Sequence, residues 1–433
     1  MDAAPVPSVP IANTKLTSFY GDMTPPERRA FWACFTGWAL DGVDFMIYPL
    51  VLSTIIATWH VDRSWAGFAT TLTLLASAVG GWLAGYLSDR IGRVRTLQIT
   101  VLWFSLFTFL CAFAQDFTQL TIARAFVGIG FGGEWAAGAV LMGETIGPQY
   151  RGRAVGTIQS AWAVGWGSAV LLQAVVFSAL EPELAWRAMF LIGIFPALLI
   201  VYVRRNVAEP AISETARAGV EDRRRPGLLA IFAPSIVGTT MLAAVLVAGV
   251  QGGYYAITTW LPTYLKVERG LTVINSTDYL TVLILGSFAG YLYGAWFADR
   301  YGRRPLFLTF SVGACAIVLV YTQVPISNGV MLVLGFPLGF FASGAFSGLG
   351  AFLTELFPTH LRGSGQDFGY NFGRGLGALT PTLVGYLSSV MPLATAMALF
   401  ASVAYGIMFV AALCLPETRG RDLRAIDQAP ARP

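Results

Sequence analysis

The chain consists of long blocks of apolar residues separated by short polar segments, and this pattern restricts its fold more than any other feature. It has 433 residues, of which 55% are hydrophobic and 12% are charged. Soluble domains carry about 25% charged residues, whereas a helix of roughly 20 apolar residues spans the hydrocarbon core of a bilayer. The sequence therefore predicts an all-α integral membrane protein.

Twelve of the apolar blocks are long enough to form transmembrane helices, and they fall into two sets of six. The predicted spans are 31–57, 66–88, 96–114, 117–143, 154–179, 188–204, 232–264, 278–298, 306–323, 329–354, 365–390 and 393–415. We accordingly expect five regions, namely an N-terminal tail (1–30), a first six-helix bundle (31–204), a linker (205–227), a second six-helix bundle (228–416) and a C-terminal tail (417–433).

The distribution of lysine and arginine predicts the orientation of these spans. If both termini are cytosolic, the inside segments carry 22 of the 28 basic residues and the outside loops carry four. Such an excess on one side is typical of cytoplasmic loops. We therefore expect cytosolic termini and a cytosolic linker.

Two short motifs occur twice, once in each half of the chain. Asp89-Arg90-x-Gly92-Arg93 recurs 210 residues later at positions 299–303, and Glu144 with Arg151 recurs 211 residues later as Glu355 with Arg362. Repeats in equivalent loops indicate two pseudo-symmetric bundles, with a site between them near the middle of the membrane.

The first of these motifs, with Gly85 before it, resembles the loop signature of the major facilitator superfamily between its second and third helices. The Pro-Glu-Thr-Arg-Gly segment from Pro416 resembles the usual ending of that family after helix twelve. The Gly-Pro-x-x-Gly-Gly pattern of many drug antiporters is missing, which favours symport or uniport. By this resemblance, the inner gate contains Gly85, Asp89, Arg90, Gly92, Arg93, Asp299, Arg300, Gly302, Arg303, Glu144, Arg151, Glu355 and Arg362.

Within this superfamily, Asp41-Gly42-Val43-Asp44 looks like the D-G-x-D element of organic-acid:proton symporters. The segments 132–135 and 370–374 look more like the sialate and monocarboxylate branch. The resemblance implies proton-coupled symport of a monocarboxylate or sialate-like anion by alternating access. An aromatic-acid (hydroxybenzoate-like) symporter, or a carrier of another small polar metabolite, stays open as an alternative.

Ionisable residues inside the spans are candidates for proton coupling, because a charge at mid-bilayer costs about 2.5–3.5 kcal/mol. Asp41 and Asp44 are three positions apart and share one face of a helix. Two close carboxylates in a medium of low dielectric do not both ionise easily, so the pKa of one of them should rise. Glu134 is a third candidate. The alternative is that one aspartate only neutralises Arg124.

Arg374 is the predicted contact for the acid group of the substrate. It lies about ten residues, or roughly 15 Å, beyond the cytosolic start of its span, which is close to the midplane. Its guanidinium offers a planar fork to a carboxylate. The alternative is a permanent salt bridge to an acid on another helix. Further expected substrate contacts are Arg124, Asn371, Gln159, Trp162, Gln251 and Tyr255.

The sequence argues against several other functions. It contains no phosphate-binding G-x-x-x-x-G-K-[ST] loop, no cysteine–histidine cluster and no nucleophile elbow, which disfavours an ATP-driven pump and an enzyme. A channel or a membrane-bound sensor stays an alternative. We expect no metal or cofactor, since the proton gradient would supply the energy. The expected partners are a small organic acid, protons and lipid, without nucleic acid. The expected state is a monomer in the bacterial inner membrane.

Overall fold

The computed structural model describes residues 18–91, 93–145, 151–195, 197, 228–357 and 361–419, and almost all of them are helical. The first half contains α1 (Ser18–Asp22), α2 (Pro25–Trp59), α3 (Arg63–Ile91), α4 (Arg93–Cys111), α5 (Phe117–Thr145), α6 (Arg151–Ala179) and α7 (Pro182–Ile192). The second half contains a short 3₁₀ helix (Leu228–Phe232), α10 (Val237–Val267), α11 (Val273–Tyr301), α12 (Arg303–Gln323), α13 (Asn328–Gly344), α14 (Phe346–Leu356), α15 (Arg362–Gly377), α16 (Leu379–Leu387) and α17 (Leu393–Cys414).

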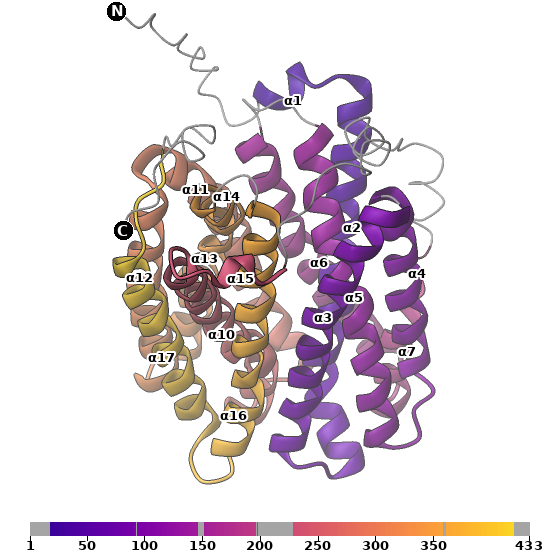
Figure 1. Ribbon diagram of the computed structural model, residues 1–433. Coiled ribbons are helices and arrows are strands. Elements are labelled where there is room, and N and C mark those ends of the chain that lie inside the picture. The colour runs from indigo at the N-terminus through magenta and orange to yellow at the C-terminus, as the bar shows by residue number, and fades with distance from the viewer. Residues whose placement is uncertain are drawn as a thin grey trace, which may run out of the picture.

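Two groups of helices lie side by side, α2–α7 in indigo to magenta and α10–α17 in red to yellow (Figure 1). They follow the twelve predicted spans in order, if α13 with α14 and α15 with α16 are each taken as one span. Among the described residues, nine segments are long and apolar enough to cross a bilayer. The predicted all-α membrane fold with two six-helix bundles is therefore confirmed. Residues 198–204 of the predicted sixth span, the linker 205–227 and the tail segments 1–17 and 420–433 lie outside the described residues.

The first transmembrane helix begins earlier than predicted. Helix α2 starts at Pro25, six positions before the expected residue 31. Proline is favoured in the first turn because its missing N–H has no partner there in any case. The Glu27 carboxylate also accepts a hydrogen bond from the backbone N–H of Thr24, at 2.7 Å. A hydropathy window detects the apolar block but not these polar residues at the helix start.

The predicted eleventh span, 365–390, is two helices that meet at Ala378. Pro381 has no N–H to donate to the carbonyl of Gly377, four residues earlier. The Thr380 hydroxyl donates to that carbonyl instead, at 2.8 Å. The carbonyl of Ala378 accepts a hydrogen bond from Thr71, which belongs to the first bundle.

The predicted tenth span, 329–354, is likewise interrupted, at Ala345 between α13 and α14. The Ser347 hydroxyl donates to the carbonyl of Gly344 at 2.6 Å. A serine hydroxyl bonded to a carbonyl three residues earlier competes with the backbone bonding of a helix. Both breaks therefore correspond to side-chain hydroxyls that bond to backbone carbonyls.

The two bundles meet along three seams, where α3 contacts α15 and α16, α6 contacts α11, and α2 contacts α10. At the predicted outer end, Thr382 on α16 donates to the Thr71 hydroxyl on α3 at 2.7 Å. Lys266 on α10 donates to the Thr54 hydroxyl on α2 at 3.4 Å. These polar contacts join the bundles on the side where α3 begins and α16 ends.

Two glycines bring α15 close to α10 and thereby determine how α15 is oriented. A Cβ at Gly373 would lie 2.6 Å from the carbonyl oxygen of Ala244, and a Cβ at Gly377 would lie 2.8 Å from the backbone nitrogen of Gly252. No residue with a side chain fits such distances, and small residues at i and i+4 allow close helix packing. The residue after Gly373, Arg374, contacts the first bundle instead.

Candidate functional site

Arg374 is buried between the two bundles, with only 2% of its surface exposed. Its Nη1 donates to the hydroxyl of Ser77 on α3, at 3.3 Å. Its guanidinium carbon lies 4.8 Å from the ring centre of Tyr370 and 5.4 Å from that of Phe131, both suitable for cation–π contact. Its Nε has no hydrogen-bond partner among the described residues. The cation is therefore held by both bundles and retains an unused donor.

Aromatic rings from both bundles extend this site away from Arg374. Phe45 on α2 lies 5.3 Å from Phe131 on α5, 5.6 Å from Trp162 on α6 and 6.2 Å from Tyr255 on α10, measured between ring centres. With Tyr370 these residues form what we call the aromatic cluster, and all five are buried. The cluster offers flat apolar surface directly beside a fixed positive charge.

Asp41 on α2 is fully buried and lies within electrostatic range of Arg374. The two residues belong to different bundles. Asp41 is thus a buried acid on the first bundle, within electrostatic range of a buried cation on the second.

Asp44 faces a different arginine, inside the first bundle. Its Oδ2 accepts a hydrogen bond from Thr108 at 2.8 Å, and it lies within electrostatic range of Arg124. Arg124 is fully buried, with its guanidinium carbon 5.1 Å from the ring centre of Tyr48. The two aspartates expected on one helix face thus each have their own arginine. The hypothesis that one aspartate only neutralises Arg124 stays a prediction, and Asp44 is the aspartate to which it would apply.

The other predicted substrate contacts lie around the same seam. Trp162 donates from its indole nitrogen to the hydroxyl of Tyr254 at 2.7 Å, across the two bundles. Asn371 packs against α3, where a Cβ at Gly81 would lie 2.9 Å from its Oδ1. Gln159 is buried on α6. For Glu134 on α5 the structure describes only the backbone.

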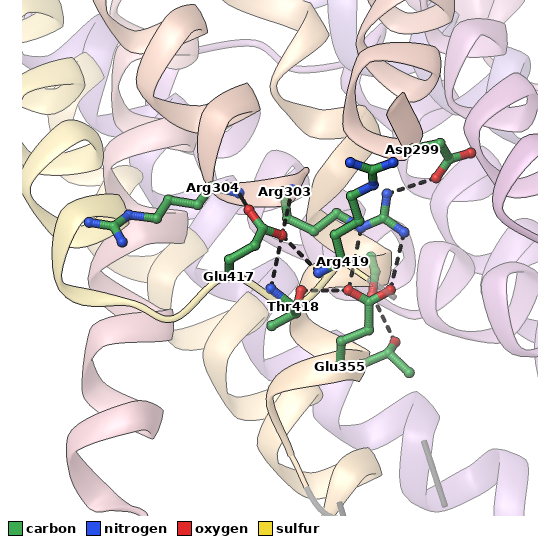
Figure 2. A network of polar contacts seen from close by, with 9 residues as sticks. Asp299, Arg303, Arg304, Glu355, Glu417, Thr418 and Arg419 are labelled. Carbon is green, nitrogen blue, oxygen red and sulfur yellow. Dashed lines mark hydrogen bonds and ion pairs between the residues drawn. The ribbon is translucent and has the colours of Figure 1, made fainter. Parts of the chain in front are cut away.

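The second copy of the repeated motif forms a polar network at the predicted inner end (Figure 2). Arg303 at the start of α12 donates to Asp299 at 2.7 Å and to Oε1 of Glu355 at 3.1 Å. Gly302 joins α11 to α12 with a φ of 119°, a conformation that side-chain-bearing residues rarely adopt. Arg300 is exposed. The structure therefore brings Asp299, Arg303 and Glu355 together, as the motif predicts.

The first copy of the motif is less fully described. Gly92 lies outside the described residues. The structure places the remaining members on their helices without describing their side chains; these are Gly85, Asp89, Arg90, Arg93, Glu144 and Arg151, together with Arg362 of the second copy. Their role in a gate therefore remains a prediction.

Glu417 completes the inner network, and sequence reasoning did not assign it a role. Its carboxylate accepts hydrogen bonds from the backbone N–H groups of Arg303 at 3.0 Å and Arg304 at 2.9 Å, so it caps the start of α12. Burial opposes its charge, but these bonds and those from Arg419 and Thr418 lower the pKa of the Glu417 carboxyl below its ordinary value. The hydroxyl of Thr418 donates to Glu355.

Other members of the site also escaped prediction, including Ser77, Phe131, Thr108 and Phe45. Ser77 and Thr108 lie in no motif that stands out from the surrounding apolar sequence, whereas Phe45 directly follows the Asp41–Asp44 element and Phe131 directly precedes the segment 132–135. Tyr370 is different, because it begins the segment 370–374 that carries Arg374. That segment indicated the region of the site, although not the ring contact itself.

Comparison with known proteins gives three kinds of similarity. Residues 33–379 and 277–432 match the family described as Major Facilitator Superfamily. The chain is 40% identical over 414 residues to a Cupriavidus pinatubonensis protein described as "Probable 4-methylmuconolactone transporter", covering 96% of each chain. It is 30% identical to the cis,cis-muconate transport protein of Acinetobacter baylyi, covering 84% of this chain and 88% of that one. The structure of the proton:xylose symporter XylE has a TM-score of 0.73 at 17% identity, covering 93% of this chain and 99% of that chain.

Proposed function

The chain belongs to the Major Facilitator Superfamily, and from that premise we propose that it is a secondary transporter that carries an organic anion together with a proton. The family assignment confirms the resemblance inferred from the loop motifs, and it confirms a transporter rather than an enzyme. Membership of a membrane-transport family agrees with the long apolar helices of the structure.

The proposed substrate is a planar carboxylate, either aromatic or conjugated. The observation that carries this proposal is the position of Arg374, buried between the bundles with the aromatic cluster beside it. The guanidinium suits a carboxylate, and the rings suit a flat unsaturated body. The two relatives, described as a lactone transporter and a dienoic-acid transporter, agree with such a substrate. Among the expected alternatives, this favours the aromatic-acid type over a sialate-like acid.

Proton coupling follows because the Asp41 carboxylate and the substrate carboxylate both interact with the guanidinium of Arg374. When a substrate carboxylate binds the guanidinium, Asp41 loses part of its compensating charge in a medium of low dielectric. Protonation of Asp41 then removes the unfavourable charge, so the anion and the proton are bound together. Asp44, beside Arg124, provides a second site for a proton within the first bundle.

During alternating access, the contacts between the bundles at their outer end and at their inner end would break and form in turn. The outer contacts, such as that of Thr382 with Thr71, would break when the site opens outward. The network of Arg303, Glu355 and Glu417 would keep the inner ends of the second bundle together as a unit. We propose a monomer in the bacterial inner membrane with cytosolic termini.

The test uses purified protein in proteoliposomes loaded with unlabelled benzoate. An alternating carrier takes up labelled benzoate by counterflow and concentrates it transiently, which a channel cannot do. We expect counterflow, and we expect an inwardly directed proton gradient to drive net accumulation of trans,trans-muconate, whose two charges keep it from crossing lipid unaided. If benzoate, nicotinate and muconate all fail to give counterflow above that of protein-free liposomes, the proposed substrate class is wrong.

A further inference from the structure

Gln251 on α10 carries a buried amide donor that no described residue satisfies. The side chain is 1% exposed, and its Nε2 has no hydrogen-bond partner among the described residues. Its Oε1 accepts a hydrogen bond from the hydroxyl of Tyr255. With the oxygen accepting this bond, the Nε2 hydrogens are available for another acceptor.

The amide lies beside the Arg374 site. A Cβ at Gly377, three residues beyond Arg374, would lie 3.1 Å from the Cβ of Gln251. Tyr255 belongs to the aromatic cluster, bonds to Gln251 and lies within electrostatic range of Arg374. The α10 and α15 walls of the site thus each contribute an unused donor, Nε2 of Gln251 and Nε of Arg374.

We propose that Gln251 is a second binding point, which selects planar acids that carry a hydrogen-bond acceptor in addition to the carboxylate. Arg374 binds the carboxylate, and Nε2 of Gln251 donates to a carbonyl oxygen, a ring nitrogen or a second carboxylate on the same molecule. A buried donor without a partner destabilises the complex, so an acid without the second acceptor binds more weakly. This inference rests on the proposed function, because it assumes that the acid occupies the Arg374 site.

The test compares acids that differ only in the second acceptor. Benzoate is compared with picolinate, nicotinate and isonicotinate. In these three acids a ring nitrogen replaces the C–H group at the ortho, meta or para position, respectively, relative to the carboxylate. Sorbate is compared with trans,trans-muconate, which has a second carboxylate in place of a methyl group. Inhibition constants are measured against benzoate counterflow in proteoliposomes containing the full chain.

Gln251→Met is the informative variant, because it keeps the length of the side chain and removes the donor. Gln173→Met is the matched control, since Gln173 is also buried but donates to the backbone carbonyl of Leu50 within the first bundle, at 2.7 Å. Tyr255→Phe is a second variant, to be used if Gln251→Met does not fold. It removes the bond that orients the amide and should weaken the preference in part.

We expect at least one acceptor-bearing acid to bind about tenfold or more tightly than its parent, and Gln251→Met to abolish this preference. Gln251→Met should bring the inhibition constants of each acid and its parent together, whereas Gln173→Met should keep the preference. The proposal is overturned if no acid gains from its acceptor, or if the gain survives in Gln251→Met. Failure of the proposed function looks different, because then there is no benzoate counterflow above that of protein-free liposomes.

Discussion

Replacing Arg374 with lysine separates the role of the guanidinium fork from that of the positive charge. In the structure the fork donates to Ser77 through Nη1, and Nε has no partner in the part of the chain that the structure describes, so it can bind a carboxylate through more than one N–H. Lysine keeps the charge that compensates Asp41 but offers a compact ammonium group. We therefore expect Arg374→Lys to insert and fold but to bind the substrate weakly.

The size of the effect follows from the loss of one charge-assisted hydrogen bond. Such a bond contributes about 1.5–3 kcal/mol, and each 1.4 kcal/mol corresponds to about tenfold in affinity. The half-saturating concentration of benzoate should therefore rise by about 10- to 150-fold. Arg374→Met would go further, because it leaves Asp41 buried without its cation, and we expect less folded protein in the membrane.

The assay is benzoate counterflow in proteoliposomes, with the amount of folded protein measured by gel filtration in detergent. Arg29→Lys is the matched control, since Arg29 is exposed near the start of α2. Its half-saturating concentration should equal that of the unmodified chain. An unchanged half-saturating concentration in well-folded Arg374→Lys would refute the assignment of the guanidinium as the carboxylate site.

Three further substitutions test other parts of the structure. Asp44→Asn should retain membrane insertion and part of the counterflow but lose accumulation driven by a pH gradient, measured as the ratio of internal to external trans,trans-muconate. Phe131→Leu should weaken benzoate binding by removing a ring that contacts Arg374, at a cost of about 0.5–1.5 kcal/mol or roughly two- to tenfold in the inhibition constant. Glu417→Gln should lower the thermal unfolding temperature in detergent at neutral pH, because it weakens a helix cap contributing about 1 kcal/mol. Since the pKa of Glu417 lies below its ordinary value of 4.5, its stabilising effect is present above that value and is lost as the pH falls through the lowered pKa. The difference in unfolding temperature between the unmodified chain and Glu417→Gln should shrink over that acidic range.

Each of these predictions has an outcome that contradicts it. Full pH-driven accumulation in Asp44→Asn would exclude Asp44 as a proton carrier. An unchanged inhibition constant for Phe131→Leu would mean that the rings do not contact the substrate. A difference in unfolding temperature that stays constant from neutral to strongly acidic pH would show that the charge of Glu417 does not stabilise the inner network.

Much of the fold could be predicted because a bilayer requires long apolar helices whose backbone bonds are satisfied internally. The helix breaks at Ala345 and Ala378 could not be predicted in this way. A hydropathy average does not show that the hydroxyl groups of Ser347 and Thr380 bond to backbone carbonyls there. Pro381 was a local signal for the second break, but it lies inside a continuous apolar stretch.

The candidate site was predictable in part for a similar reason. Buried charges such as Arg374 and Asp41 stand out in apolar sequence because they are costly in a membrane. Which aspartate faces which arginine depends on how the bundles pack, and spacing along one helix does not contain that information. The capping of α12 by Glu417 joins residues more than a hundred positions apart, so only the tertiary structure shows it.

The most direct test of the central claim is the pH inside proteoliposomes while an acid enters. A pyranine-loaded, weakly buffered lumen is followed after addition of trans,trans-muconate, whose two charges keep it from crossing lipid unaided. Proton-coupled symport predicts acidification in step with muconate uptake, absent from protein-free liposomes and strongly reduced in Arg374→Lys. Uptake of muconate without any acidification, or uptake that requires sodium, would contradict it.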